Sequence, residues 1–252
     1  MKPEPSTDLG DRAAKTQAEA LTRLIRSDII KGALRPGDRL GMRALQDRYE
    51  VGISPLREAL SRLIAFSLVT AEGQRGFRVA DASKADLLDL IKTAVWTECA
   101  ALRASIALGD RKWEAEVVAS AHRLGIGDRD APQRYFDEEW EEDHRVFHRC
   151  LVSACQSPRL LSMRGLLFEG VERYRRLSTT YGGGDRDVNG EHRALVDSVL
   201  RRDAATATRL MQAHLMETTR ILLRARSSSD AVVVDKIDML TAEIATWERS
   251  SP

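Results

Sequence analysis

Beyond about Ala82, apolar residues recur at helical spacing almost to the end of the chain. This long stretch of helical periodicity is the feature that most constrains the fold. It predicts a body built of helices. The expected helices cover residues 84–108, 111–124, 132–155, 158–180, 186–201, 203–226 and 231–249. Apolar residues make up 43% of the 252 residues but aromatic residues only 5%, so the core must consist mainly of Leu, Ala, Val and Ile.

The first 80 residues follow a different pattern, with three short helices and then two extended runs. The expected helices are 17–31, 42–49 and 55–66, and the extended runs are 68–72 and 76–80. Ser54 is the expected N-cap of the third helix, and residues 73–76 form the tip of a hairpin. Inward-facing residues of the second and third helices should be Ala44, Leu45, Tyr49, Leu56, Ala59, Leu60, Leu63 and Ile64. This succession predicts a winged helix-turn-helix.

The charge is divided unevenly along the chain. Residues 16–80 carry 11 Lys and Arg against 7 Asp and Glu, whereas residues 81–252 carry 25 against 28. The third helix presents Ser54, Arg57 and Arg62 opposite its apolar stripe. A helix of this size fits the major groove of DNA, where base edges can be read, so the basic segment is expected to bind nucleic acid.

Three stretches of this segment carry a family pattern. They are IIKGALRPGDRL, LQDRYEVGISPLREALSRL and SLVTAEGQRGFRV. The pattern resembles the DNA-binding domain of the GntR family of bacterial regulators, and the resemblance implies that Arg43, Ser54, Arg57 and the wing glycine Gly76 contact operator DNA. Two departures are Ile53, where many members carry a guanine-reading Arg, and Ser67, where a glycine is usual.

Four of the five histidines fall in the helical body at positions that could converge. His144 and His148 are four residues apart, so their rings lie on one helix face, and His192 and His214 lie on two later helices. Apolar neighbours at helical offsets place these rings near the core, where a divalent metal ion can satisfy imidazole nitrogens. The alternative is a chance or surface arrangement for the pair. His122 lies outside the pattern and is expected at the surface.

The same region resembles the all-helical effector domain, called FCD, of the FadR-type branch of the GntR family. The matching segments are HRVFHRCLVSACQSPRLL and EHRALVDSVLRRDAATATRLMQAHL. The resemblance implies that His148, His192 and His214 bind a divalent ion, with His144 at the position where metal-binding members carry Asp. An all-nitrogen ligand set favours zinc or nickel. Asp143, about 100° away on the helix, is not expected to substitute, and a metal-free pocket remains the alternative.

The resemblance also implies a small carboxylic acid as effector. The pattern around Trp140 and His144 is similar to that of glutarate-responsive regulators, which suggests a C4–C6 dicarboxylate or hydroxy acid. The usual anchoring arginine, four residues before Glu98, is replaced by Ala94, so another cation must act. Candidate effector-binding residues are Arg173, Tyr174, Arg176 and Arg103. The acidic run over 137–143 is expected to be a solvated helix face.

These features predict a mainly α protein with a DNA-binding part and a sensing part. The expected divisions are a disordered arm (1–15), the winged helix-turn-helix (16–80), a linker (81–85), the effector-binding and dimerisation domain (86–226) and a C-terminal helix (227–252). An inverted-repeat operator requires a homodimer, and most relatives in this family are repressors released by effector.

Alternative functions are a regulator with a structural metal and, remotely, a metal-dependent hydrolase; an enzyme is not expected. The polar N-terminus carries no signal-peptide core and no segment could span a membrane, so a cytoplasmic protein is expected. The three cysteines, Cys99, Cys150 and Cys155, fit reduced thiols.

Overall fold

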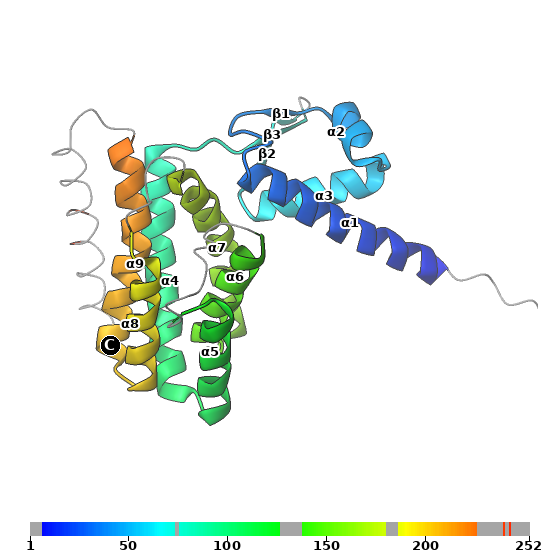
Figure 1. Cartoon of the computed structure of the whole chain (residues 1–252). Coiled ribbons are helices and arrows are strands. Elements are labelled where there is room, and N and C mark those ends of the chain that lie inside the picture. Colours follow the sequence, from blue (N-terminus) through cyan, green and yellow to red (C-terminus); the bar gives the residue numbers. More distant parts are fainter. Residues whose placement is uncertain are drawn as a thin grey trace, which may run out of the picture. The chain divides into compact units, whose positions relative to one another are not determined.

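The computed structural model divides the chain into two compact units, Met1–Ser83 and Lys84–Pro252, which we call the head and the body (Figure 1). It describes residues 7–73, 76–126, 138–179 and 186–225, with two isolated positions at 239 and 242. Within these ranges, every helix is too short or too polar to cross a lipid bilayer.

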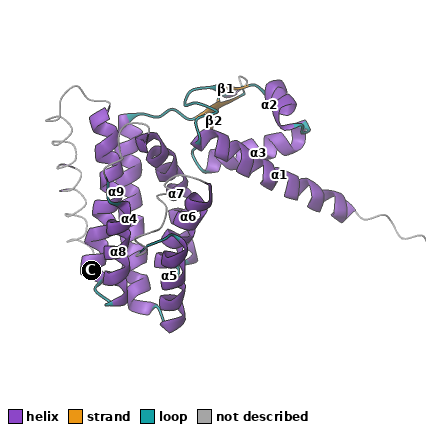
Figure 2. Ribbon diagram, viewed as in Figure 1, coloured by secondary structure: helices purple, strands orange, loops and turns teal. Residues whose placement is uncertain are grey.

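In its described part, the head contains three helices and a small antiparallel sheet (Figure 2). Its elements are α1 (Thr7–Ile30), β1 (Arg39–Leu40), α2 (Met42–Tyr49), α3 (Ile53–Ala65), β2 (Val69–Ala71) and β3 (Phe77–Val79). The strand order is β1-β3-β2, with Val69 opposite Val79 and Arg39 opposite Arg78. The core joins the apolar faces of all three helices to the sheet through residues such as Ile25, Leu60 and Val79. The predicted winged helix-turn-helix is therefore the fold of the head.

The first helix begins earlier than its apolar spacing predicted. It starts at Thr7, so residues 7–15 are helical and not a disordered arm; residues 1–6 lie outside the described part. The prediction relied on an apolar stripe, which begins only near Gln17. A polar stretch can extend a helix whose packed part lies further along.

The third helix also differs in detail from its prediction. Its N-cap is Gly52, in an extended conformation, so Ser54 lies inside the first turn and is not the cap. Ile64 is 37% exposed and Ala44 on α2 is exposed, although both were expected to face inward. Each lies at the edge of its helix's apolar stripe, where the neighbouring elements of this small head do not reach.

The body consists, in its described part, of six helices, among which α4 packs against α6, α7 and α9 (Figure 1). They are α4 (Lys84–Leu108), α5 (Arg111–Arg123), α6 (Glu138–Val152), α7 (Pro158–Thr179), α8 (Val188–Leu200) and α9 (Ala204–Ala225). Helix α4 packs mainly against α7 and α9, while α8 packs on α9 and α5 on α6. Each of these helices matches a predicted one. The predicted helix 231–249 and the start of 132–155 lie outside the described residues.

Two aspartates set the starts of body helices. The carboxylate of Asp110 accepts a hydrogen bond from the backbone N–H of Trp113 at the start of α5, and Asp187 does the same for Gly190 at the start of α8. The cap at Asp187 fixes the backbone next to Arg186, whose side chain reaches the centre of the body.

Candidate functional site

Four histidines from three helices meet in the middle of the body. His144 and His148 come from α6, His192 from α8 and His214 from α9, and one ring nitrogen of each lies within 4.8 Å of the others. Ring centroids are 4.5 Å apart between His144 and His148, and 4.7 Å apart between His192 and His214. No ring is more than 6% exposed. The structure thus brings together the four histidines that the sequence singled out, which we call the histidine cluster.

The nitrogens of this cluster are suited to a metal ion. Both ring nitrogens of His144, His148 and His192 are buried without a hydrogen-bond partner among the described residues. A buried polar atom left in this way costs about 1–3 kcal/mol unless something binds it. Nitrogens around one zinc ion, at about 2.0–2.1 Å from it, lie at most about 4.2 Å apart, so small ring movements would complete the set. The residues present therefore fit a divalent ion.

The cluster is also held in its neutral, metal-binding form. Burial lowers the pKa of His144 to about 4 and lowers the pKa values of His148 and His192 well below the ordinary value for histidine. The pKa of His214 is lowered for the same reason. Neutral imidazole is the form that donates a lone pair to a metal, so at neutral pH all four rings are ready to bind one.

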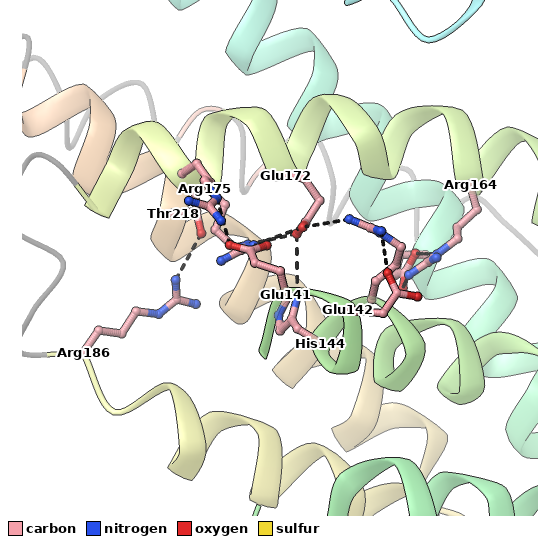
Figure 3. Close-up of polar contacts among 11 residues, drawn as sticks. Glu141, Glu142, His144, Arg164, Glu172, Arg175, Arg186 and Thr218 are labelled. Carbon is pink, nitrogen blue, oxygen red and sulfur yellow. Dashed lines mark hydrogen bonds and ion pairs between the residues drawn. The ribbon is translucent and has the colours of Figure 1, made fainter. Parts of the chain in front are cut away.

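A carboxylate held by an arginine lies behind His214. Glu191 Oε2 is 2.7 Å from His214 Nδ1, and Arg186 donates to both oxygens of Glu191 at 2.7 and 2.6 Å. Burial raises the pKa of Glu191, but the hydrogen bonds from His214 and Arg186 outweigh it and lower that pKa to about 2. Arg186 also donates to Thr218 Oγ1 on α9 (Figure 3).

A second, more deeply buried network surrounds His144 (Figure 3). Glu172 Oε1 on α7 lies 3.6 Å from His144 Nδ1, and Arg175 donates to both Glu172 oxygens at 2.9 and 3.0 Å. Arg175 also contacts Glu141 on α6. Although burial opposes it, the charge of Arg175 keeps the pKa of Glu172 well below its ordinary value. The network ties α6 to α7 next to the cluster.

The prediction that the acidic run of α6 is a solvated helix face is therefore only partly right. Glu142 is exposed, but Glu141 is only 8% exposed and pairs with Arg175 and Arg176. Trp140 stacks on His144 with ring centroids 4.7 Å apart and lies beneath the guanidinium of Arg175. The helical period of the sequence could have placed Glu141 near His144, which is three residues further along the same helix.

A buried ion pair connects α4 to α7 beside the cluster. Arg164 donates to both carboxylate oxygens of Glu98 at 2.8 and 3.1 Å, and both side chains are almost fully buried. The Arg164 guanidinium lies 4.3 Å from the ring of Phe168, whose ring in turn lies 6.0 Å from that of His148. Ala94 and Arg164 line the same small cavity. Sequence reasoning expected another arginine in this region but did not identify Arg164.

The proposed effector-binding residues fall in different environments. Arg173 and Tyr174 are buried on α7, and the Tyr174 hydroxyl donates to Asp86 at 2.7 Å. Arg176 Nε lies 3.0 Å from Glu141 Oε1. Arg103 is exposed on α4 and does not join the buried cluster. The structure thus brings Arg176, but not Arg103, to the network beside the histidines.

Two further residues lie where the sequence suggested. His122 is exposed on α5. Asp143 Oδ1 lies 3.9 Å from Arg123 Nε, away from the histidine nitrogens.

The proposed DNA-contacting residues of the head are largely accessible. Arg43 on α2 and Ser54 and Arg57 on α3 are exposed, and Gly76 follows the wing tip with φ at +92°, a conformation that favours glycine. Arg62 is less free, because it lies 2.7 Å from Glu58 and 3.4 Å from Glu19. The exposed basic residues therefore lie at the start of α3 and on α2, as recognition by the beginning of a helix requires.

Comparison with known proteins agrees with the division of the chain into head and body. Residues 17–79 match the model of bacterial regulatory proteins of the gntR family, and residues 79–217 match the FCD domain. The transcriptional regulator BphR of Paraburkholderia xenovorans is 42% identical over 81% of this chain and 84% of its own length. The transcriptional repressor GlaR of Escherichia coli is 38% identical over 82% of this chain and 96% of its own.

Solved structures share the fold at low sequence identity. Escherichia coli McbR/YncC superposes with a TM-score of 0.69 at 18% identity, covering 84% of this chain and 99% of that protein. A GntR regulator from Rhodococcus sp. RHA1 gives a TM-score of 0.64 at 21% identity, covering 82% of this chain and 98% of that protein. These two likenesses concern the fold alone.

Proposed function

Since the chain belongs to the GntR family of bacterial transcriptional regulators, with an FCD domain as its body, we propose that it is a cytoplasmic repressor whose operator affinity is set by a small carboxylic acid bound at a metal ion in the histidine cluster. The relatives and both families are regulators and not enzymes. The observation that carries the sensing part of the proposal is the set of buried, unpartnered ring nitrogens. A related protein named as a repressor, GlaR, supports the sign of regulation.

Operator recognition by α3 gives a first prediction. Replacing Arg57 by alanine should weaken operator binding by about 5- to 150-fold, the loss of one good base contact of roughly 1–3 kcal/mol. Fluorescence anisotropy with an operator selected from genomic fragments measures this loss. Arg159→Ala, an exposed arginine on α7 of the body, is the matched control and should bind as the wild type does. Equal affinity of Arg57→Ala and wild type would show that Arg57 does not contact the operator.

The charge of the centre indicates what kind of effector it binds. Four neutral imidazoles leave a divalent ion with both of its charges, because the ligand set contains no carboxylate. The bound ion would supply a Lewis-acidic centre with open positions for oxygen ligands. Burying this charge is unfavourable unless an anion accompanies it, so a dicarboxylate is better suited to the site than a neutral ligand.

The second carboxylate of such an effector has a cationic partner in the network beside His144. Arg175 and Arg176 both engage Glu141 of α6, and an incoming carboxylate can take the place of Glu141. This exchange would loosen the link between α6 and α7 and couple the effector to helix positions. Such a coupling is typically about 1–3 kcal/mol and acts reciprocally between the two ligands.

A thermal-shift series tests the effector proposal. C4–C6 dicarboxylates are expected to raise the Tm of zinc- or nickel-loaded protein and to have little effect after metal removal. Glu141→Gln keeps the shape of the side chain and is expected to bind the acid more tightly, because the competing carboxylate is lost. Stabilisation that is equal with and without metal would favour a metal-free pocket. Stabilisation by metal alone, with no response to any acid, would favour a structural ion.

The oligomeric state and the sign of regulation are tested together. Two heads reading an inverted repeat require a twofold-symmetric dimer, so sedimentation should give a mass of about twice 28.1 kDa. Saturating acid should lower operator affinity about 5- to 150-fold for a coupling of the usual size. If operator affinity rises with the acid, the acid would be a co-repressor or the protein would be an activator.

A further inference from the structure

The contacts around Glu191 determine which nitrogen of His214 carries its proton. An ionised carboxylate can only accept hydrogen bonds, and the 2.7 Å distance from Glu191 Oε2 to His214 Nδ1 requires a hydrogen between them. The hydrogen must therefore be on Nδ1. Arg186 Nη2 is also 3.2 Å from Nδ1, but Nη2 already donates to Glu191 Oε2 and to the His214 carbonyl, each at 2.6 Å. Its two hydrogens are thus used elsewhere.

With the proton on Nδ1, the lone pair of His214 is on Nε2, the nitrogen left for the cluster. We propose that Glu191, held by Arg186, is a positioning residue that fixes this tautomer and ring orientation for metal binding. The inference rests on the proposed metal site and adds a residue to it. Outer carboxylates of this kind typically change metal affinity about 10- to 100-fold. His144 has a looser counterpart, because its Nδ1 is 3.6 Å from Glu172, beyond hydrogen-bond distance.

The chain offers a matched control for Glu191. The Glu191 side chain is 30% exposed and pairs with Arg186, and the Glu114 side chain is also 30% exposed and pairs with Arg202. Glu114 lies on α5, and its hydrogen bonds among the described residues come from Arg202 and not from a histidine. Comparing substitutions of Glu191 and Glu114 therefore separates an effect on His214 from the loss of a partly exposed ion pair.

Cobalt(II) titration against a chelating competitor tests the inference with the full chain. Glu191→Ala is expected to bind cobalt about 10- to 100-fold more weakly than wild type. Glu191→Gln, whose amide oxygen still accepts from Nδ1–H, should recover most of that loss, and Glu114→Ala should match wild type. Cobalt affinity of Glu191→Ala within twofold of wild type would overturn the inference. Failure of the wild type to bind cobalt would instead overturn the metal site itself.

A spectroscopic measurement tests the tautomer without any metal. The ¹⁵N chemical shifts of His214 in the metal-free wild type should be those of a ring protonated on Nδ1 and unprotonated on Nε2. Because this uses the wild-type chain, it holds even if a variant folds poorly. The opposite tautomer would contradict the role given to Glu191.

A separate observation concerns the start of α3, the helix proposed to recognise the operator. Ile53, the first residue of α3, is 52% exposed, whereas Leu56, Leu60 and Leu63 of the same helix are fully buried. Ser54, the next residue, and Arg57, one helical turn further along, are also exposed, at the end of the helix expected to meet base edges. The apolar group that DNA presents in the major groove is the C5 methyl of thymine. We infer that Ile53 contacts a thymine methyl and selects thymine at one position of each half-site.

Selection from a random DNA library, followed by removal of the methyl, tests this contact. Wild type should select a thymine that Ile53→Ala does not. Replacing that thymine by deoxyuridine should weaken wild-type binding by about fourfold, the value for one buried methyl group, and leave Ile53→Ala unchanged. Leu24→Ala, a 56% exposed aliphatic residue on α1, serves as the control and should keep the preference. Equal wild-type affinity for thymine and deoxyuridine at every selected position would overturn the inference.

Discussion

Replacing His148 by alanine is expected to abolish the stabilisation of this protein by zinc or nickel. His148 is 1% exposed, and its ring lies within 5.3 Å, centroid to centroid, of each of the other three histidine rings. An ion present at 100 times its Kd adds about 2.7 kcal/mol to the folded state. For a domain of this size that is a Tm increase of roughly 5–11 °C. Removing a central ligand should reduce the shift to near zero.

The matched control is His122→Ala on the exposed side of α5. It removes the same chemical group from the surface and should leave the shift intact. The measurement compares chelator-treated and metal-loaded samples of each variant by calorimetry. A His148→Ala protein that still gains several degrees from the metal would show that the ion binds elsewhere. In the metal-free state, His148→Ala leaves a cavity but also removes two buried nitrogens that lack partners, so its intrinsic stability should change less than for an apolar core residue.

Breaking the buried pair of Arg164 and Glu98 is expected to destabilise the body by about 3–5 kcal/mol. The reason is that Arg164→Met leaves the Glu98 carboxylate buried between α4 and α7 without its bidentate partner. The double variant Glu98→Gln with Arg164→Met removes both charges and should recover a large part of the loss. Urea unfolding followed by circular dichroism measures each free energy of unfolding.

An exposed pair provides the comparison for this prediction. Arg62 and Glu58 lie four residues apart on α3 and are 32% and 45% exposed. Arg62→Met should therefore cost only about 0.3–0.5 kcal/mol. If Arg164→Met cost no more than Arg62→Met, the buried pair would have no structural role, and Arg164 would be available for a ligand.

Periodicity predicted the helices well because it reflects what each helix must bury. The boundaries of 84–108 and 42–49 agree with α4 and α2, and the four histidines converge because their helical offsets put them on apolar faces. The sheet was harder to predict. The two-residue strand β1 carries too short a pattern to be recognised, and it exists only because β3 pairs with it.

The partners of the charged residues could not be predicted from the sequence. Glu98 and Arg164 are 66 positions apart, and Glu191 reaches His214 across 23, so each pairing depends on how helices pack and not on local spacing. The acidic run of α6 looked solvated because most of its members are charged. The helical offset from His144 could have placed Glu141 near the cluster, but its pairing with Arg175 and Arg176 depends on how α7 packs against α6.

The histidine cluster takes its four residues from three helices, with His144 and His148 on α6, His192 on α8 and His214 on α9. No short peptide of this chain contains the full set, so an ion bound at the proposed site could not nucleate folding as it does in a zinc finger. On the proposed metal site, capture of an ion would follow the docking of α6, α8 and α9, which brings residues far apart in the sequence together. If the proposed site binds an ion, its affinity would therefore depend on the packing of the whole body, and a nascent or proteolytically cut chain would fail to retain metal.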